Sequence, residues 1–85
     1  MAAQVDVYST DYCPYCRAAE RMLDAKGIKY TAYDVSDDHD KRNWLLETTG
    51  MYTVPQIFID GQPIGGFTDM QALERQGKLN EMLGI

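Results

Sequence analysis

The chain has 85 residues, enough for one domain with a modest core, because a domain of this size buries only about 60–65% of its unfolded surface. Its formal net charge of −5 argues against binding to nucleic acids and to anionic membranes, and no apolar run approaches the ~20 residues of a membrane span. The first residues show no basic segment followed by an apolar stretch, so we expect no secretory signal and a cytoplasmic protein.

The first half of the chain predicts a strand, a helix and a second strand. Residues 5–8 alternate apolar and polar side chains, as a core strand does. A helix follows over residues 17–26, where apolar side chains recur at helical spacing; Pro14 suits its first turn and Gly27 its end. Residues 28–35 form the second predicted strand, with apolar side chains on one face.

The second half predicts another helix and then a pair of strands. Residues 38–49 form the helix, and Gly50 ends it. Two short strands follow over residues 56–59 and 62–64. Between them stands Asp60-Gly61, which is a strong signal for a two-residue hairpin turn.

A third helix and the element order complete the predicted fold. Residues 68–71 have a capping-box pattern that opens this helix, and Gly77 ends or bends it before a final turn around Leu79 and Leu83. The order is strand-helix-strand-helix-strand-strand-helix. The helix between the first two strands implies a parallel pair with a right-handed crossover, and the hairpin adds an antiparallel edge. The sequence therefore predicts an α/β fold with a four-stranded mixed sheet packed between helices.

Cys13-Pro14-Tyr15-Cys16 contains the only two cysteines of the chain, where the first strand gives way to the first helix. Unpaired N–H groups and the positive end of the helix dipole favour a negatively charged sulfur at such a place. A C-x-x-C pair beside a β-α-β pattern indicates thiol redox chemistry. Cys13 is the expected nucleophile because it precedes the helix, whereas Cys16 lies inside the first turn.

Two other interpretations of the cysteine pair are weaker. Both cysteines could be small buried apolar residues, which is a common environment for this residue type. They could instead be half of a metal site. Zinc takes four ligands and His39 is the only histidine, so we expect no metal site within one chain.

Two further markers lie later in the chain. Pro55 precedes the third strand, and on general statistics its peptide bond is trans, because only about 5–6% of X–Pro bonds in folded proteins are cis. A cis bond would turn the Val54 backbone outward, where it could pair with an extended, peptide-like ligand. Gly65-Gly66 before Thr68 and Asp69 would let a ligand approach a helix N-terminus that suits a carboxylate, although a turn with a helix cap is the simpler explanation.

Three motifs make the chain resemble the glutaredoxins over essentially its whole length. The resemblance implies a thioredoxin-like fold, a single glutaredoxin domain over residues 1–85, a cis bond before Pro55, and glutathione as a ligand lying across the cysteine pair. Together the motifs are highly specific, and they occur in the expected order and spacing: Cys13-Pro14-Tyr15-Cys16, Thr53-Val54-Pro55-Gln56-Ile57-Phe58-Ile59 and Ile64-Gly65-Gly66-x-x-Asp69.

The resemblance also implies a role for each site residue. Cys13 would be the nucleophile that becomes glutathionylated, and Cys16 the resolving thiol. Tyr15 would pack along the groove, and the Val54 backbone would pair with the cysteinyl unit of glutathione. The implied glutathione site comprises Cys13, Tyr15, Arg42, Thr53, Val54, Pro55, Gly66, Thr68 and Asp69.

The two ends of glutathione would be held by different elements. The γ-glutamyl end would meet the backbone N–H of Thr68, and the Asp69 carboxylate would pair with its ammonium. Arg42 falls where the family places a polar or basic residue for the glycyl carboxylate. Taken alone, Arg42 is equally well explained as a residue on the solvated face of a helix.

One position departs from the family pattern. The family commonly has a lysine three residues before the nucleophile, whereas this chain has Thr10, followed by Asp11. A threonine supplies no positive charge, and a neighbouring carboxylate opposes a negative sulfur. We therefore expect weaker stabilisation of the Cys13 thiolate than in relatives that carry the lysine.

The leading hypothesis is a dithiol glutaredoxin that reduces protein–glutathione mixed disulfides and protein disulfides. Glutathione would regenerate it as a co-substrate, with no permanently bound cofactor. The implied partners are disulfide-containing or glutathionylated proteins, with ribonucleotide reductase and similar disulfide-cycling enzymes as candidates, and we expect a monomer. Two alternatives stay open: a thioredoxin-like donor reduced by a flavoprotein reductase, and a dimer that binds an iron–sulfur cluster through Cys13 and glutathione.

Overall fold

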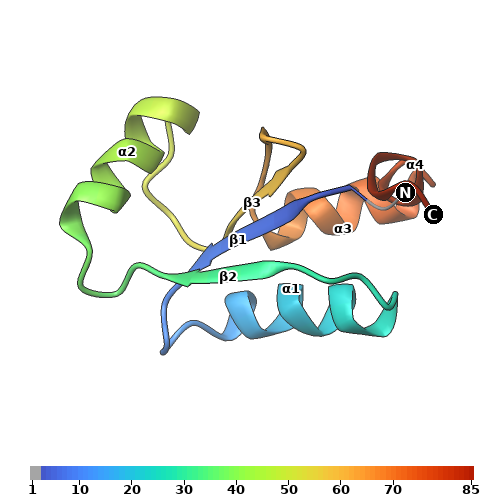
Figure 1. The fold of residues 1–85 in the computed structure, drawn as a ribbon, viewed down its shortest axis with the longest axis horizontal. Coiled ribbons are helices and arrows are strands. Elements are labelled where there is room, and N and C mark those ends of the chain that lie inside the picture. Colours follow the sequence, from blue (N-terminus) through green and yellow to red (C-terminus); the bar gives the residue numbers. More distant parts are fainter. Residues whose placement is uncertain (1–2) are drawn as a thin grey trace.

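Eight elements of secondary structure are present in the computed structural model, which describes residues 3–85. They follow the predicted order, with the expected final turn as a short fourth helix (Figure 1). No helix within that range is long and apolar enough to cross a membrane. In chain order the elements are β1 (Val5–Ser9), α1 (Pro14–Ala25), β2 (Thr31–Asp34), α2 (His39–Thr49), β3 (Gln56–Ile59), β4 (Gln62–Gly65), α3 (Phe67–Arg75) and α4 (Leu79–Leu83).

The four strands form one mixed sheet in the order β2-β1-β3-β4. β1 runs parallel to β2, with α1 as the crossover, and antiparallel to β3. β3 and β4 form the predicted hairpin, whose turn places Asp60 at φ 52° and Gly61 at φ 79°. Two consecutive positive φ angles are typical of the tight hairpin turns that Asp-Gly adopts. The predicted four-stranded mixed sheet is therefore confirmed.

One strand is shorter than the sequence predicts. β2 spans Thr31–Asp34 rather than residues 28–35, because only these four residues pair with β1. All four are exposed, since β2 is an edge strand of the sheet. Ile28 lies before the strand and is buried, so the apolar pattern at the start of this segment belongs to the loop after α1.

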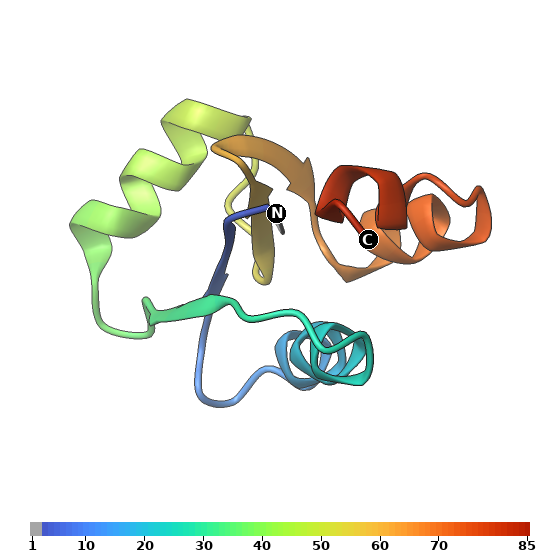
Figure 2. The same cartoon turned by 45° about the vertical axis from the view of Figure 1, so that its right-hand side comes forward.

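The larger core lies on the face of the sheet that α1, α3 and α4 cover (Figure 2). Val7 of β1 and Ile57 of β3 point into it and are fully buried. They meet Leu23 of α1, Met70 of α3 and Leu79 of α4, which are also fully buried. Burying an apolar side chain of this size stabilises the fold by about 1.5–3 kcal/mol, so this layer is the main source of stability.

Of the described helices, α2 is the one on the opposite side of the sheet (Figure 2). The smaller core there joins Tyr8, Val35, Leu45 and Phe58. Trp44 of α2 stacks on Phe58, with ring centres 5.7 Å apart, and lies 5.6 Å from Tyr8. Leu45 is the only fully buried residue within α2, so aromatic contacts carry much of the packing of this helix.

Candidate functional site

The cysteine pair lies where β1 gives way to α1, as the sequence predicts. Cys13 is the N-cap of α1, with an extended backbone (φ −101°, ψ 111°), and Pro14 is the first helical residue. Cys13 Sγ accepts a hydrogen bond from the backbone N–H of Cys16, with an N···S distance of 3.2 Å. The sulfur thus takes the place of an oxygen cap at a helix N-terminus, where N–H groups and the helix dipole stabilise negative charge.

The two thiols differ in their accessibility. Cys13 is partly exposed, whereas Cys16 is fully buried. Burial and, to a smaller extent, a hydrogen bond with Cys13 raise the pKa of Cys16 from 9 to about 12, although the Thr10 backbone opposes this rise. Cys16 is therefore a neutral thiol at neutral pH, and Cys13 is the sulfur that a partner can reach.

The raised pKa of Cys16 predicts a loss of stability in alkali. The folded protein holds this proton more tightly than the unfolded chain, so the stabilisation is complete below about pH 9 and declines as the pH rises toward 12. The decline cannot exceed about 1.4 kcal/mol per pH unit. Urea unfolding between about pH 8 and about pH 10.5, with reductant, should show a steeper decline for the wild type than for Cys16→Ala. Equal slopes in the two proteins would refute the assignment.

Residues 51–54, called the groove loop below, bring the second motif beside the first. The Val54–Pro55 peptide bond is cis, as the resemblance implies and against the general statistics of X–Pro bonds. The Val54 carbonyl oxygen is 3.7 Å from Cys13 Sγ, within reach of the thiol S–H. The two motifs, far apart in the sequence, are therefore neighbours in the fold.

Three polar side chains fix the backbone of the groove loop. The side-chain amide of buried Gln56 donates to the Met51 carbonyl at 2.7 Å. The Met51 N–H donates to Thr49 Oγ1 at 3.1 Å. Arg42 donates to the Tyr52 carbonyl at 3.1 Å, and its guanidinium lies 4.6 Å from the centre of the Tyr52 ring. The loop is thus held from α2 on one side and from β3 on the other.

The N-terminus of α3 carries the third motif. The helix starts at Phe67 with Gly66 as its N-cap, and the Asp69 carboxylate accepts a hydrogen bond from the Gly66 N–H at 2.9 Å. The capping box predicted for residues 68–71 is therefore wrong, because the N-cap lies two residues earlier. A Cβ at Gly66 would lie 3.3 Å from the Pro55 carbonyl oxygen, so the glycine allows this helix to approach the cis-proline closely.

These segments line a groove of about 400 Å³. Tyr15 forms part of its wall and stacks on Phe67 of α3, with ring centres 6.1 Å apart. Seven of the nine predicted glutathione residues line the groove, and Cys13 adjoins it through its contact with Val54. The lining residues are Tyr15, Met51, Thr53, Val54, Pro55, Gly66, Phe67, Thr68 and Asp69.

Two lining residues, Met51 and Phe67, were not predicted from the sequence. Both are large apolar residues close to predicted motif residues, and this position is the signal that could have identified them. Arg42, in contrast, is not among the lining residues and contacts the groove loop instead. Its role toward the glycyl carboxylate stays a prediction.

The side chain at the position that commonly carries lysine in the glutaredoxins is buried in this protein. Thr10 is fully buried, and its Oγ1 has no hydrogen-bond partner within residues 3–85. The guanidinium of Arg17 donates to the Thr10 carbonyl at 3.3 Å, but its charge is paired with the Glu20 carboxylate at 3.2 Å. None of the nine lining residues is Lys or Arg, so the side chains of the groove walls supply no positive charge to an anion.

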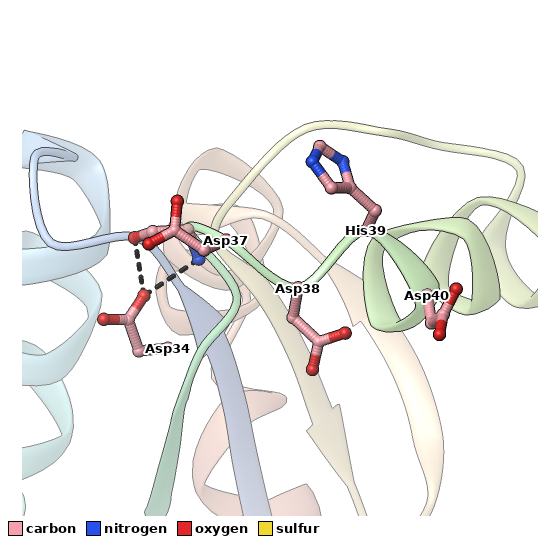
Figure 3. Close-up of a pocket in the computed structure, with 6 residues that line it drawn as sticks. Asp34, Asp37, Asp38, His39 and Asp40 are labelled. Carbon is pink, nitrogen blue, oxygen red and sulfur yellow. Dashed lines mark hydrogen bonds between the residues drawn. The ribbon is translucent and has the colours of Figure 1, made fainter.

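A larger hollow of about 610 Å³ lies where β2 leads into α2 (Figure 3). Two hydrogen bonds that Ser36 donates to Asp34 lower the pKa of this carboxyl. The bond from the Ser36 hydroxyl has the larger effect, and the bond from its N–H the smaller. The carboxylates in Figure 3 point in different directions, and residues 3–85 hold no group of three or more metal-ligating side chains arranged around one point. This hollow has no cysteine in its lining, which consists of Asp34, Ser36, Asp37, Asp38, His39 and Asp40.

Comparison with known sequences finds one family over most of the chain. The family model described as Glutaredoxin matches residues 5–64. Glutaredoxin 3 of Escherichia coli strain K12 is 40% identical over 81 residues, which cover 95% of this chain and 98% of that protein. The glutaredoxin of Pseudomonas aeruginosa is 39% identical over 79 residues, covering 93% and 94% of the two chains.

Solved structures agree with the sequence matches. The crystal structure of the buckwheat glutaredoxin–glutathione complex has a TM-score of 0.90 and 34% identity, over 96% of this chain and 77% of that one. The solution structure of the glutaredoxin from Brucella melitensis has a TM-score of 0.85 and 38% identity, over 96% and 89%. The thioredoxin-like fold expected from the sequence is therefore confirmed.

Proposed function

Because the chain belongs to the glutaredoxin family, we propose that it is a glutathione-dependent enzyme that reduces protein–glutathione mixed disulfides and protein disulfides. Membership of the family supplies the general role of a thiol–disulfide oxidoreductase. The observation that carries the glutathione-dependent reaction is the groove beside Cys13, which is large enough for part of a small peptide and has the N-terminus of α3 and the Asp69 carboxylate in one wall.

The proposed monothiol reaction runs in two exchanges at Cys13. The Cys13 thiolate attacks the glutathione sulfur of a mixed disulfide, the bond to the protein sulfur breaks, and the protein thiolate leaves and takes up a proton. A second glutathione thiolate then attacks the glutathione sulfur held on Cys13, which forms glutathione disulfide and releases the Cys13 thiolate. The N–H of Cys16 donates to this sulfur and stabilises the thiolate as it forms.

The proposed reaction with protein disulfides also uses Cys16. Cys13 first forms a mixed disulfide with the partner and releases one partner thiolate. Cys16 then loses its proton and attacks the Cys13 sulfur, which releases the second partner thiolate and leaves a Cys13–Cys16 disulfide. Burial restricts Cys16 to this internal attack, and its raised pKa keeps it protonated until then. Two glutathione molecules restore the dithiol and become glutathione disulfide.

We propose that glutathione lies along the groove with its sulfur at Cys13. The Val54 backbone pairs with the cysteinyl unit, and the Thr68 N–H and the Asp69 carboxylate hold the γ-glutamyl end. Arg42 meets the glycyl carboxylate from α2. The rest of the ligand's surroundings is provided by Tyr15, Thr53, Pro55 and Gly66.

Replacing Asp69 with Asn should raise the KM for a glutathione mixed disulfide about tenfold, equal to about 1.4 kcal/mol, because a charge-assisted bond to the ammonium is lost. The Asn side-chain oxygen can still accept the Gly66 N–H that Asp69 Oδ2 accepts at 2.9 Å, so the helix start is kept. Asp60→Asn is the matched control. Asp60 also accepts one backbone N–H, from Gln4 at 3.0 Å, but it lies at the far end of β3. An unchanged KM in the Asp69 variant would refute the role.

We further propose that residues 1–85 act as a single domain and as a monomer in the cytoplasm, with glutathione as co-substrate and no permanently bound cofactor. A monomer keeps the groove open to glutathionylated proteins. Disulfide-cycling enzymes such as ribonucleotide reductase are the candidate partners, because each of their turnovers leaves a disulfide that a dithiol donor must reduce.

A further inference from the structure

We propose that Met51 is an oxidation site through which peroxide weakens glutathione binding, an inference that rests on the glutathione site proposed above. Met51 lines the groove and is 39% exposed. The other methionines among residues 3–85 are buried or partly buried: Met22, Met70 and Met82. A thioether reacts with peroxide where solvent reaches the sulfur, so Met51 is the favoured target among them.

Hydrogen bonds fix the backbone of Met51 beside the groove that this residue lines. Its carbonyl accepts the Gln56 amide at 2.7 Å, and its N–H donates to Thr49 Oγ1 at 3.1 Å. Gln56 is itself only 1% exposed. Arg42 donates to the carbonyl of Tyr52, the residue after Met51. A change in the polarity of this side chain therefore changes the polarity of the groove wall, because the loop is held on both sides.

The surroundings of Met51 make a sulfoxide unfavourable when ligand is bound. Met51 also lines a neighbouring hollow of about 300 Å³, and both cavities are lined by Asp69, the proposed partner of the γ-glutamyl ammonium. A sulfoxide oxygen is a strong acceptor that water hydrates well. A ligand that covers it removes this hydration, and none of the groove-lining side chains is a Lys or Arg that could donate a charge-assisted hydrogen bond in place of the water.

The chemistry is a two-electron oxidation. The Met51 sulfur attacks one oxygen of hydrogen peroxide, the O–O bond breaks, and the products are methionine sulfoxide and water. Cys13 is not consumed by this step. Where peroxide meets the protein as its Cys13–Cys16 disulfide, later reduction would restore the reactive thiol, but the enzyme would bind glutathione mixed disulfides less tightly until a methionine sulfoxide reductase returned the thioether.

The test oxidises the full chain with hydrogen peroxide while Cys13 and Cys16 are held as their disulfide, and then restores both thiols with dithiothreitol. Peptide mass mapping locates the added oxygen, and steady-state kinetics with a glutathione mixed disulfide are measured before and after. We expect oxygen at Met51 before Met22 or Met82, and about a tenfold rise in KM with kcat little changed.

Two variants of Met51 and one control variant keep the outcome decisive. Met51→Leu, compared with its own untreated sample, should show no rise in KM after peroxide. Met51→Gln, which places a polar acceptor at the same position, should show a raised KM without peroxide. Met82→Leu is the control for oxidation elsewhere and should respond to peroxide as the wild type does.

Three results overturn the inference: earlier oxidation of Met22 or Met82, an unchanged KM once Met51 is oxidised, or a Met51→Leu protein that responds like the wild type. The untreated wild type separates these results from failure of the proposed function. If it does not reduce the mixed disulfide at all, the proposed reaction and this inference fall together. If it is active and its KM ignores Met51 oxidation, this inference falls alone.

Discussion

Replacing Cys13 with Ser is expected to slow reduction of a glutathione mixed disulfide by ~1000-fold or more, because a serine hydroxyl is not ionised at neutral pH and cannot carry the glutathionyl group through a disulfide. Cys13 is the partly exposed thiol of the pair, and its sulfur accepts the Cys16 N–H at 3.2 Å. A serine oxygen can keep this helix cap, so the variant should remain folded. The assay couples glutathione disulfide formation to NADPH oxidation through glutathione reductase.

Cys16→Ser is the matched control for this experiment. It should retain much of the reduction of mixed disulfides, which needs one thiol, and lose the reduction of protein disulfides, which needs two. Full activity in Cys13→Ser would show that another group is the nucleophile. If the wild type and both variants are inactive but thioredoxin reductase reduces the wild type, the fold stands and the proposed glutathione site is wrong.

Replacing Gly65 with Ala is expected to destabilise the protein by about 2–4 kcal/mol, the combined effect of a disfavoured backbone angle and an overlap. Gly65 has φ 106°, which residues with a side chain rarely adopt, and a Cβ there would lie 2.7 Å from Asp69 Cγ. The carboxylate must then move, and the Gly66 N–H loses its acceptor. Urea unfolding measures the loss, and the KM for a glutathione mixed disulfide should rise in the same variant.

Gly61→Ala separates the two causes. Gly61 also has a positive φ, 79°, but a Cβ there meets no atom within 4 Å. We expect about 1 kcal/mol of destabilisation from the backbone angle alone and no change in KM, since the β3–β4 turn lies away from the groove. Equal losses of stability in the two variants would mean that the overlap with Asp69 has no energetic consequence.

The elements could be predicted from the sequence because each carries a local signal. Asp60-Gly61 specifies a tight hairpin, and Gly50 ends α2 with φ 76°, as a residue without Cβ allows. β2 was predicted too long because Ile28 is buried without being in a strand. Periodicity reports burial, and it cannot by itself separate a paired strand from a buried loop residue.

The groove could be predicted only through the family resemblance. Nothing in the residues around Val54 indicates that its carbonyl oxygen lies 3.7 Å from Cys13 Sγ, since that contact depends on how β1 and β3 pair. Taken alone, the motif residues favoured a trans bond before Pro55, whereas the bond is cis. The motifs identified which segments meet, and the geometry of the meeting came from the tertiary structure.

Side-chain partners were the least predictable feature. Arg42 was placed on α2 correctly, but its stacking on Tyr52 depends on the path of the groove loop. Thr10 was recognised as a departure from the family pattern, but its complete burial was not foreseen. Both depend on loops, whose course is set by contacts distant in the sequence rather than by local propensity.

The groove draws its walls from the first turn of α1, the groove loop and the start of α3, three stretches that an unfolded chain does not hold together. A ligand that fits the groove therefore binds only the folded form, and its binding free energy adds to the free energy of unfolding. Bound glutathione would act as a removable cross-link between the two halves of the chain. The concentration of glutathione around the protein would then determine how long the protein stays folded as well as how fast it catalyses its reaction.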